Sequence, residues 1–144
     1  MKNYGYFVFF LLTAIAGLHI YWAFGGLWPG TTSRELIDMV IGSSVMTEMP
    51  PMPITLFVAI LIFISGLLAL ALSGVLNPSP RWLALTLGFF ASLVFLARGL
   101  AGYGADRLGI SRTEIFATYD MWLYSPICLL IGSIMLALFI HKRV

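Results

Sequence analysis

The sequence predicts an all-α membrane protein, a four-helix transmembrane bundle with two short amphipathic surface helices in its outer loops. Hydrophobic residues make up 60% of the 144 residues and charged residues only 10%, whereas a soluble domain carries about 25% charged residues. The mean hydropathy is +0.99. The apolar residues are concentrated in four runs, each near the ~20 residues that cross a bilayer as a helix. We therefore expect residues 1–144 to form a single integral membrane domain.

The four predicted transmembrane helices cover residues 4–24, 54–76, 82–102 and 121–140. Lys2 and the apolar run after it also suit a signal peptide with a cleavage site at residues 14–16. The run continues beyond that point, which favours a retained helix. The second and third helices are joined by Asn77-Pro78-Ser79-Pro80, which predicts a tight turn.

The charged residues predict the orientation of the chain in the membrane. Basic residues without an acid among them flank both termini and the short turn: Lys2, Arg81, Lys142 and Arg143. In the two longer loops, three arginines (Arg34, Arg107, Arg112) are outnumbered by six acids: Glu35, Asp38, Glu48, Asp106, Glu114 and Asp120. The positive-inside rule then predicts a multi-pass protein of the cytoplasmic (inner) membrane with both termini cytoplasmic.

Each longer loop contains a sequence that predicts a short surface helix. Thr32 and Glu35 in the first loop have the spacing of a capping box, and so do Ser111 and Glu114 in the second. The order of long helix, surface helix, proline and long helix thus occurs twice, and some transporters are built from such repeats. Chance similarity between two amphipathic hairpins explains the pattern as well, and we favour it.

Polar residues near the outer ends of the long helices form the candidate binding site. By the rise of an α-helix, His19 and Arg98 lie in the outer leaflet. Asp120 and Tyr124 share a face of the last helix, and Trp22 shares a face with His19. Because ionisable residues inside a membrane are costly and usually functional, we expect one outward-facing pocket lined by His19, Trp22, Arg98, Asp120 and Tyr124.

The same residues also suit a purely structural role. Arg98 can extend to the interface, or pair with Asp120 and so lock two helices together. His19 would then be a satisfied hydrogen-bonding residue between helices. The sequence leaves both interpretations open.

Methionines recur at every third position of the first loop, at Met46, Met49 and Met52. Thioethers are soft ligands that suit Cu(I), so this proline-stiffened segment is a candidate copper site. No Cys or His interleaves the methionines, so we favour the alternative that the methionines dip into lipid.

Several classes of function lack their sequence features. Cys128 is the single cysteine, so an internal disulfide or a CxxC redox pair is excluded. No acid lies at mid-membrane, which argues against a small proton-coupled antiporter. The small, scattered net charge of +2 predicts no nucleic-acid partner. Without a P-loop, GxGxxG, HExxH or GxSxG motif, no cofactor is predicted.

The segment His19-Ile20-Tyr21-Trp22-Ala23-Phe24-Gly25-Gly26 resembles the HxYWxxGG signature of the DUF3995 family of small bacterial membrane proteins. Arg98-Gly99, and Asp120 with Tyr124-Ser125-Pro126 and Cys128, resemble its later motifs. The resemblance spans most of the chain and is weakest in the first outer loop. It implies the fold and the choice of residues but no reaction, because the family has no assigned biochemical activity.

The leading interpretation is a membrane protein that binds a membrane lipid or small amphiphile. Arg98 would hold an anionic head group, which His19, Asp120 and Tyr124 would orient. A membrane-embedded enzyme would instead use His19 as acid/base, oriented by Asp120. The sequence also suits a small transporter with rocking halves, a homo-oligomer or subunit of a larger membrane complex, and a copper-binding protein.

Overall fold

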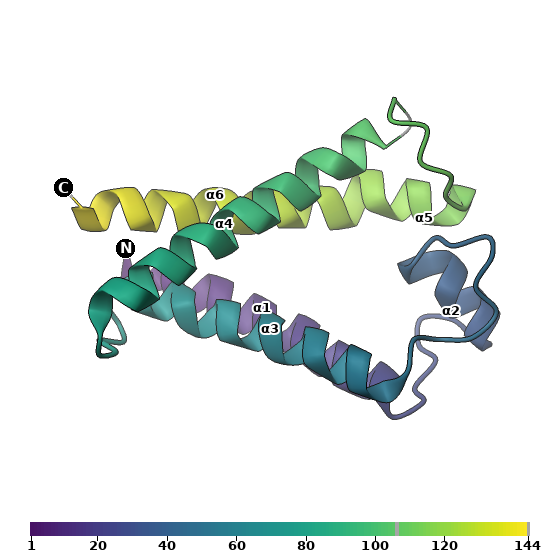
Figure 1. The fold of residues 1–144 in the computed structure, drawn as a ribbon, viewed down its shortest axis with the longest axis horizontal. Helices are drawn as coiled ribbons and strands as arrows, with labels where there is room; N and C mark the ends of the chain where they lie inside the picture. The colour runs from purple at the N-terminus through teal and green to yellow at the C-terminus, as the bar shows by residue number, and fades with distance from the viewer. Residues whose placement is uncertain (106, 144) are drawn as a thin grey trace.

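The computed structural model describes residues 1–105 and 107–143, and the regular elements in this part of the chain are all helical. Asp106, one of the acids in the charge balance above, lies outside the described residues. The elements, shown in Figure 1, are α1 (Lys2–Ala23), α2 (Ser33–Val40), α3 (Met52–Leu72), α4 (Arg81–Gly104), α5 (Glu114–Tyr119), the π-helical turn η1 (Asp120–Tyr124) and α6 (Ser125–Arg143).

Among the described residues, four helical stretches are long and apolar enough to cross a membrane: α1, α3, α4 and the continuous run of α5, η1 and α6. The predicted all-α, four-helix fold with short additional helices is therefore confirmed. The last stretch differs from expectation in one respect, because α5 leads directly into the final transmembrane helix instead of forming a separate surface helix.

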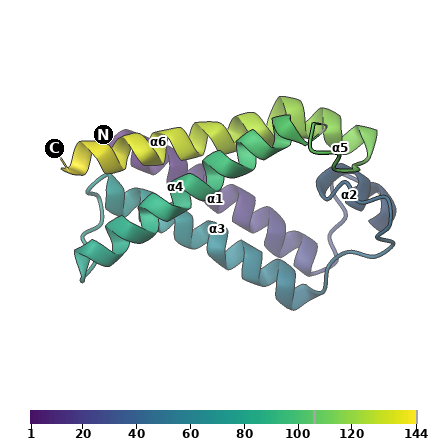
Figure 2. The same ribbon diagram turned by 45° about the horizontal axis from the view of Figure 1, so that its top comes forward.

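The four long helices pack as two antiparallel pairs, α1 with α3 and α4 with α6. The pairs converge near the two termini and diverge towards the end that carries α2 and α5 (Figures 1 and 2). A buried cluster from α1, α3 and α6 holds the pairs together: Val8, Leu12, Ala69, Leu72, Ile131, Met135 and Leu138. The divergence leaves the opposite end to be filled by the two long loops, residues 24–51 (the first loop) and 105–113 (the second loop).

Glycines allow α4 and α6 to approach closely. A Cβ on Gly132 would lie 2.8 Å from Leu96 Cγ and 2.9 Å from the carbonyl oxygen of Ser92. A Cβ on Gly102 would overlap the hydroxyl oxygen of Ser125. Helices in lipid associate through such van der Waals packing, because no hydrophobic driving force acts between them.

The helix widens for one turn at η1, where α5 passes into α6. The N–H of Ser125 donates to the carbonyl of Asp120, five residues earlier. Pro126 follows at once; it has no N–H, and its ring would clash with the carbonyl four residues earlier in a regular α-helix. The wide turn accommodates this proline. Such turns occur often at functional sites, and this one begins with Asp120.

The caps of the two short helices agree with the sequence only in part. Thr32 caps α2 as predicted, and its hydroxyl accepts from the N–H of Glu35 at 3.2 Å. In the second loop the N-cap is Thr113 instead of Ser111, with the N–H of Phe116 donating to its hydroxyl at 3.4 Å. The helix begins later because Thr113 N–H donates to the carbonyl of Gly42 at 3.0 Å, which holds the preceding residues against the first loop.

The amphipathic character of α2 decides how it lies. Leu36 and Ile37 are fully buried, whereas Glu35 is on the exposed face. The hydroxyl and N–H of Thr31 donate to the Glu35 carboxylate at 2.5 and 2.8 Å, and these bonds hold the pKa of Glu35 below its ordinary value. The helix thus covers the bundle with its apolar face and keeps a charged face outward.

We expect Gly132→Ala to destabilise the protein by about 1–3 kcal/mol, the usual cost of overpacking, because backbone atoms of α4 cannot move away from the new methyl group. Gly17→Ala is the matched control, since a Cβ there has no heavy atom within 4 Å. Reversible unfolding in mixed micelles measures both free energies. Equal stabilities for the two variants would contradict the close α4–α6 packing.

Candidate functional site

A cluster of polar side chains lies where α4, η1 and the second loop meet. Asp120 is its centre, with only 2% of its side chain exposed. Arg98 Nη2 donates to Asp120 Oδ1 at 2.8 Å, and Arg112 Nη1 donates to Oδ2 at 2.9 Å. The hydroxyl of Ser125 donates to Oδ1 at 2.9 Å. Both oxygens of the carboxylate are therefore occupied. These four residues are called the Asp120 cluster below.

Each member of the Asp120 cluster is held by a different part of the chain. Arg98 lies six residues before the end of α4, Asp120 begins the π-helical turn, and Ser125 begins α6. Arg112 also donates to the carbonyl of Gly102 at 3.1 Å. Gly102 lacks a side chain at the point where one would collide with Ser125 and Asp120, so this glycine makes room for the cluster.

The two arginines of the Asp120 cluster differ in their exposure. Arg112 is nearly buried, with 8% of its side chain exposed, whereas 40% of the Arg98 side chain is exposed. Buried charges in proteins are normally paired, and within the described residues both guanidinium groups contact the Asp120 carboxylate. Arg98 is therefore the arginine of the cluster that is open to the surroundings.

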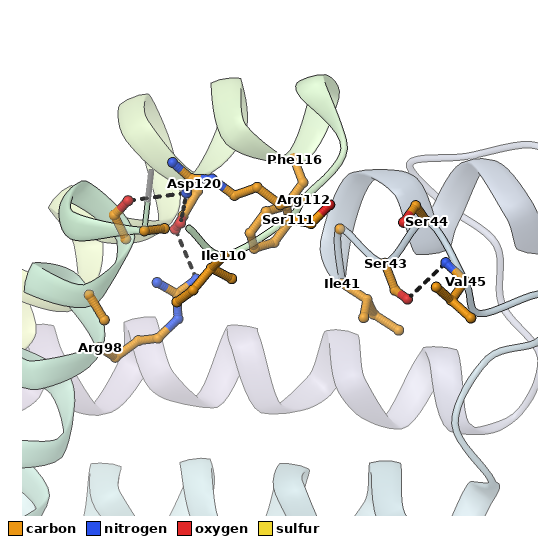
Figure 3. A pocket seen from close by; sticks show the side chains of 14 residues that line it. Ile41, Ser43, Ser44, Val45, Arg98, Ile110, Ser111, Arg112, Phe116 and Asp120 are labelled. Atoms are coloured by element: carbon orange, nitrogen blue, oxygen red, sulfur yellow. Dashed lines mark hydrogen bonds and ion pairs between the residues drawn. The ribbon is translucent and has the colours of Figure 1, made fainter. Parts of the chain in front are cut away.

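A partly open cavity of about 440 Å³ lies beside the Asp120 cluster (Figure 3). Arg98, Arg112 and Asp120 lie on one side, and Ser43 and Ser44 of the first loop lie opposite (Figure 3). Apolar side chains complete the lining: Ile41, Val45, Ile110 and Phe116. The volume falls in the range of about 300–1,000 Å³ that is typical of pockets for organic ligands. This space is called the Arg98 cavity below.

The first loop is fastened to the second helical pair by three hydrogen bonds. The hydroxyl of Thr113 donates to the carbonyl of Asp38 at 2.7 Å, and its N–H donates to Gly42. The hydroxyl of Tyr124 donates to the carbonyl of Met39 at 3.0 Å. Tyr124 does not line the Arg98 cavity, so its role is to position the opposite wall.

His19 and Trp22 line a different, smaller cavity of about 160 Å³, together with Met49 of the first loop. The predicted five-residue pocket is thus divided: Arg98 and Asp120 line one cavity, His19 and Trp22 line another. The reason is the pairing of the helices, because α1 packs against α3 on the far side of the divergence. Ile41 is common to both cavities. The smaller space is called the His19 cavity below.

The three methionines of the candidate copper segment do not line one space. Met49 lines the His19 cavity, whereas Met46 and Met52 do not. The carbonyl of Met46 accepts from Arg34 Nη1 at 2.8 Å, and Met52 begins α3 with an exposed side chain.

Comparison with known proteins adds one family match. A family model described as a protein of unknown function, DUF3995, matches residues 12–135. The chain belongs to the DUF3995 family. The match includes every residue that lines either cavity, and together with the four apolar helices it indicates a multi-pass membrane protein. No curated protein and no solved structure matches the chain.

Sequence reasoning missed two members of the Asp120 cluster of this DUF3995 protein, Arg112 and Ser125. Arg112 lies just before α5, at a position that the sequence assigns to a surface helix. Its contact with Asp120 depends on how the second loop folds back over α4, for which no periodic sequence pattern exists.

We expect Asp120→Asn to lower the free energy of unfolding by about 3–5 kcal/mol, because it removes the buried negative charge that Arg98 and Arg112 both contact. Arg98→Met should cost less, since Asp120 keeps Arg112 and Ser125. The double variant should lose less than the sum of the two single losses, because the side chains are in contact. Unfolding of all three variants measures the coupling, and strictly additive losses would contradict a direct interaction.

Proposed function

We propose that this DUF3995 protein binds an anionic amphiphile in the Arg98 cavity, with the phosphate or carboxylate head group on Arg98. The observation that carries this proposal is that the partly exposed guanidinium group of Arg98 borders a space of about 440 Å³. An anionic head group would pair with that guanidinium group. The Arg98 cavity lies at one end of the helical bundle, where a membrane lipid is the most accessible ligand of this kind.

Arg98 has the geometry that such a ligand needs. A guanidinium group has five N–H donors in a planar fork that matches two oxygens of a phosphate or carboxylate. Arg98 makes one hydrogen bond within the described part of the chain, from Nη2 to Asp120. That bond orients the group and leaves further donors for a ligand. Ser111 lines the same cavity and adds a hydroxyl group close by.

The depth of the cavity also suits a head group. Arg98 precedes the end of α4 by six residues, which is about 9 Å along the axis. A bilayer's hydrocarbon core is about 30 Å thick, and the 24 residues of α4 span about 36 Å. The helix is therefore only slightly longer than the core, and Arg98 lies near one membrane boundary. Ile110 and Val45 in the lining then supply apolar contact for the first carbons of a chain.

We further propose that this boundary is the outer face of the cytoplasmic membrane, with both termini inside. Lys2, Arg81 and Lys142 lie at the converging end, and the acids of α2 and α5 lie at the other end. This distribution follows the positive-inside rule.

Enzymatic acid–base chemistry gains no support from the contacts around His19. It requires Asp120 to orient the imidazole, but the two carboxylate oxygens accept from Arg98, Arg112 and Ser125. His19 is bonded within its own helix, at the carbonyl of Ile15. A reaction that uses this pair is therefore not proposed.

Native mass spectrometry of the purified protein tests the binding proposal. The unaltered protein should retain an anionic lipid, and Arg98→Leu should reduce the retained fraction by about tenfold, since losing a charge-assisted hydrogen bond costs about 1.5–3 kcal/mol. Arg98→Lys should recover only part, because lysine lacks the bidentate fork.

Arg34→Leu is the matched control, since Arg34 is an exposed arginine whose carboxylate partner, Asp38, lies outside the Arg98 cavity. It should leave lipid retention unchanged. No retained lipid in the unaltered protein, or equal losses in Arg34→Leu and Arg98→Leu, would count against the proposal.

Impermeant thiol reagents test the orientation. In a Cys128→Ser background, cysteines at Thr47 and Ser111 should react when whole cells are labelled, because the two loops are expected outside. A cysteine at Ser79, in the short turn, should react only after the cells are opened. The opposite labelling pattern would reverse the proposed topology.

A further inference from the structure

The His19 cavity differs from the Arg98 cavity in size and chemistry. Its volume of about 160 Å³ is well below the roughly 300 Å³ at which pockets for organic ligands begin. Such a space suits an ion. The described residues that line it include no carboxylate, and hard cations such as Ca²⁺ and Mg²⁺ require oxygen ligands. The lining therefore favours a soft cation.

His19 presents a free imidazole lone pair. Its Nδ1 lies 2.9 Å from the carbonyl oxygen of Ile15. A carbonyl only accepts, so the proton of the neutral ring is on Nδ1 and the lone pair is on Nε2. Histidines that bind metals characteristically donate the other ring N–H to a carbonyl or carboxylate in this way, which fixes the tautomer and the orientation of the ring.

Met49 supplies a soft thioether to the same cavity. The segment that follows it is fastened to α3, because the Thr55 hydroxyl lies 3.4 Å from the carbonyl oxygens of both Pro50 and Pro51. Thioether and imidazole ligands both suit copper, and the thioether selects Cu(I). The sequence offers no histidine among the methionines of this loop, but the fold brings one from α1.

Trp22 provides an aromatic face beside these two ligands. Its ring centroid is 5.0 Å from that of His19, and its Nε1 donates to the carbonyl of Trp28 at 2.7 Å, which orients the indole. Tryptophan is the side chain whose face attracts cations most strongly. The remaining lining includes the apolar side chains of Val40, Ile54 and Val58, which offer no oxygen ligand to a hard cation.

We propose that the His19 cavity is a Cu(I) site, in which His19 Nε2 and Met49 Sδ coordinate the ion and the indole of Trp22 covers it. Binding of the reduced ion involves no change of oxidation state. The site is separate from the Arg98 cavity and does not require the amphiphile proposed there, and it differs from a site made of Met46, Met49 and Met52 alone.

Competition with a colorimetric Cu(I) chelator, under anaerobic reducing conditions and with the full chain in detergent, measures the affinity. The unaltered protein should bind one ion. Met49→Leu and His19→Gln should each weaken Cu(I) binding by more than about tenfold. Removing a residue that only supports a metal ligand already costs about tenfold or more in metal affinity, and these two residues are the proposed ligands themselves. Met49→Leu conserves side-chain volume and is tolerated in packed sites, so it decides the question even where His19→Gln fails to fold.

Three controls separate this site from competing explanations. Met46→Leu and Met52→Leu should keep the affinity, since neither side chain lines the cavity. Arg98→Leu should also keep the Cu(I) affinity. Failure of the lipid proposal can therefore be distinguished from failure of the Cu(I) proposal. The proposal is overturned by absent Cu(I) binding, by unchanged affinity in Met49→Leu, or by equal losses in Met52→Leu and Met49→Leu.

Ag(I), a redox-inert ion with similar ligand preferences, gives a second readout through tryptophan fluorescence. Its quenching of the unaltered protein should be largely lost in Trp22→Phe and retained in Trp122→Phe, since Trp122 is exposed on the far helical pair. Full quenching in Trp22→Phe would show that the ion does not bind against this indole.

Discussion

The carboxylate of Asp120 is the interaction on which the open end of the protein depends. Through it α4, the second loop and the start of α6 share one ionic network in a region of low dielectric, where an unpaired charge would be costly. Two conditions make the network possible. The π-helical turn before Pro126 presents the carboxylate, and Gly102 leaves the space that it occupies.

The remaining architecture follows from the divergence of the two helical pairs. At the converging end, tightly packed apolar side chains hold α1, α3 and α6 together. At the other end that packing is replaced by two loops, and hydrogen bonds from Thr113 and Tyr124 fasten one loop to the other pair. Polar groups thus hold the two pairs together where the helices have separated, and both cavities lie in this region.

The sequence predicted the helices and part of the site because these depend on local patterns. Run length identified the membrane spans, and depth along two helices joined by one loop was enough to bring Arg98 to Asp120. His19 lines a different cavity from Arg98, and the sequence could not show this, because the largely apolar α1 does not reveal which of its faces meets α3 and which meets the other pair. Arg112 and the cap at Thr113 depend on contacts between distant loops, which no periodicity records.

Ile41 lines both cavities and forms part of a wall between them. A ligand large enough to displace this side chain from one cavity would change the shape of the other, and occupancy of the two spaces would then be thermodynamically linked. Linkage is reciprocal: the factor by which the first ligand alters the affinity for the second equals the factor in the opposite direction. A single branched side chain is thus placed to make two chemically unrelated sites report on each other.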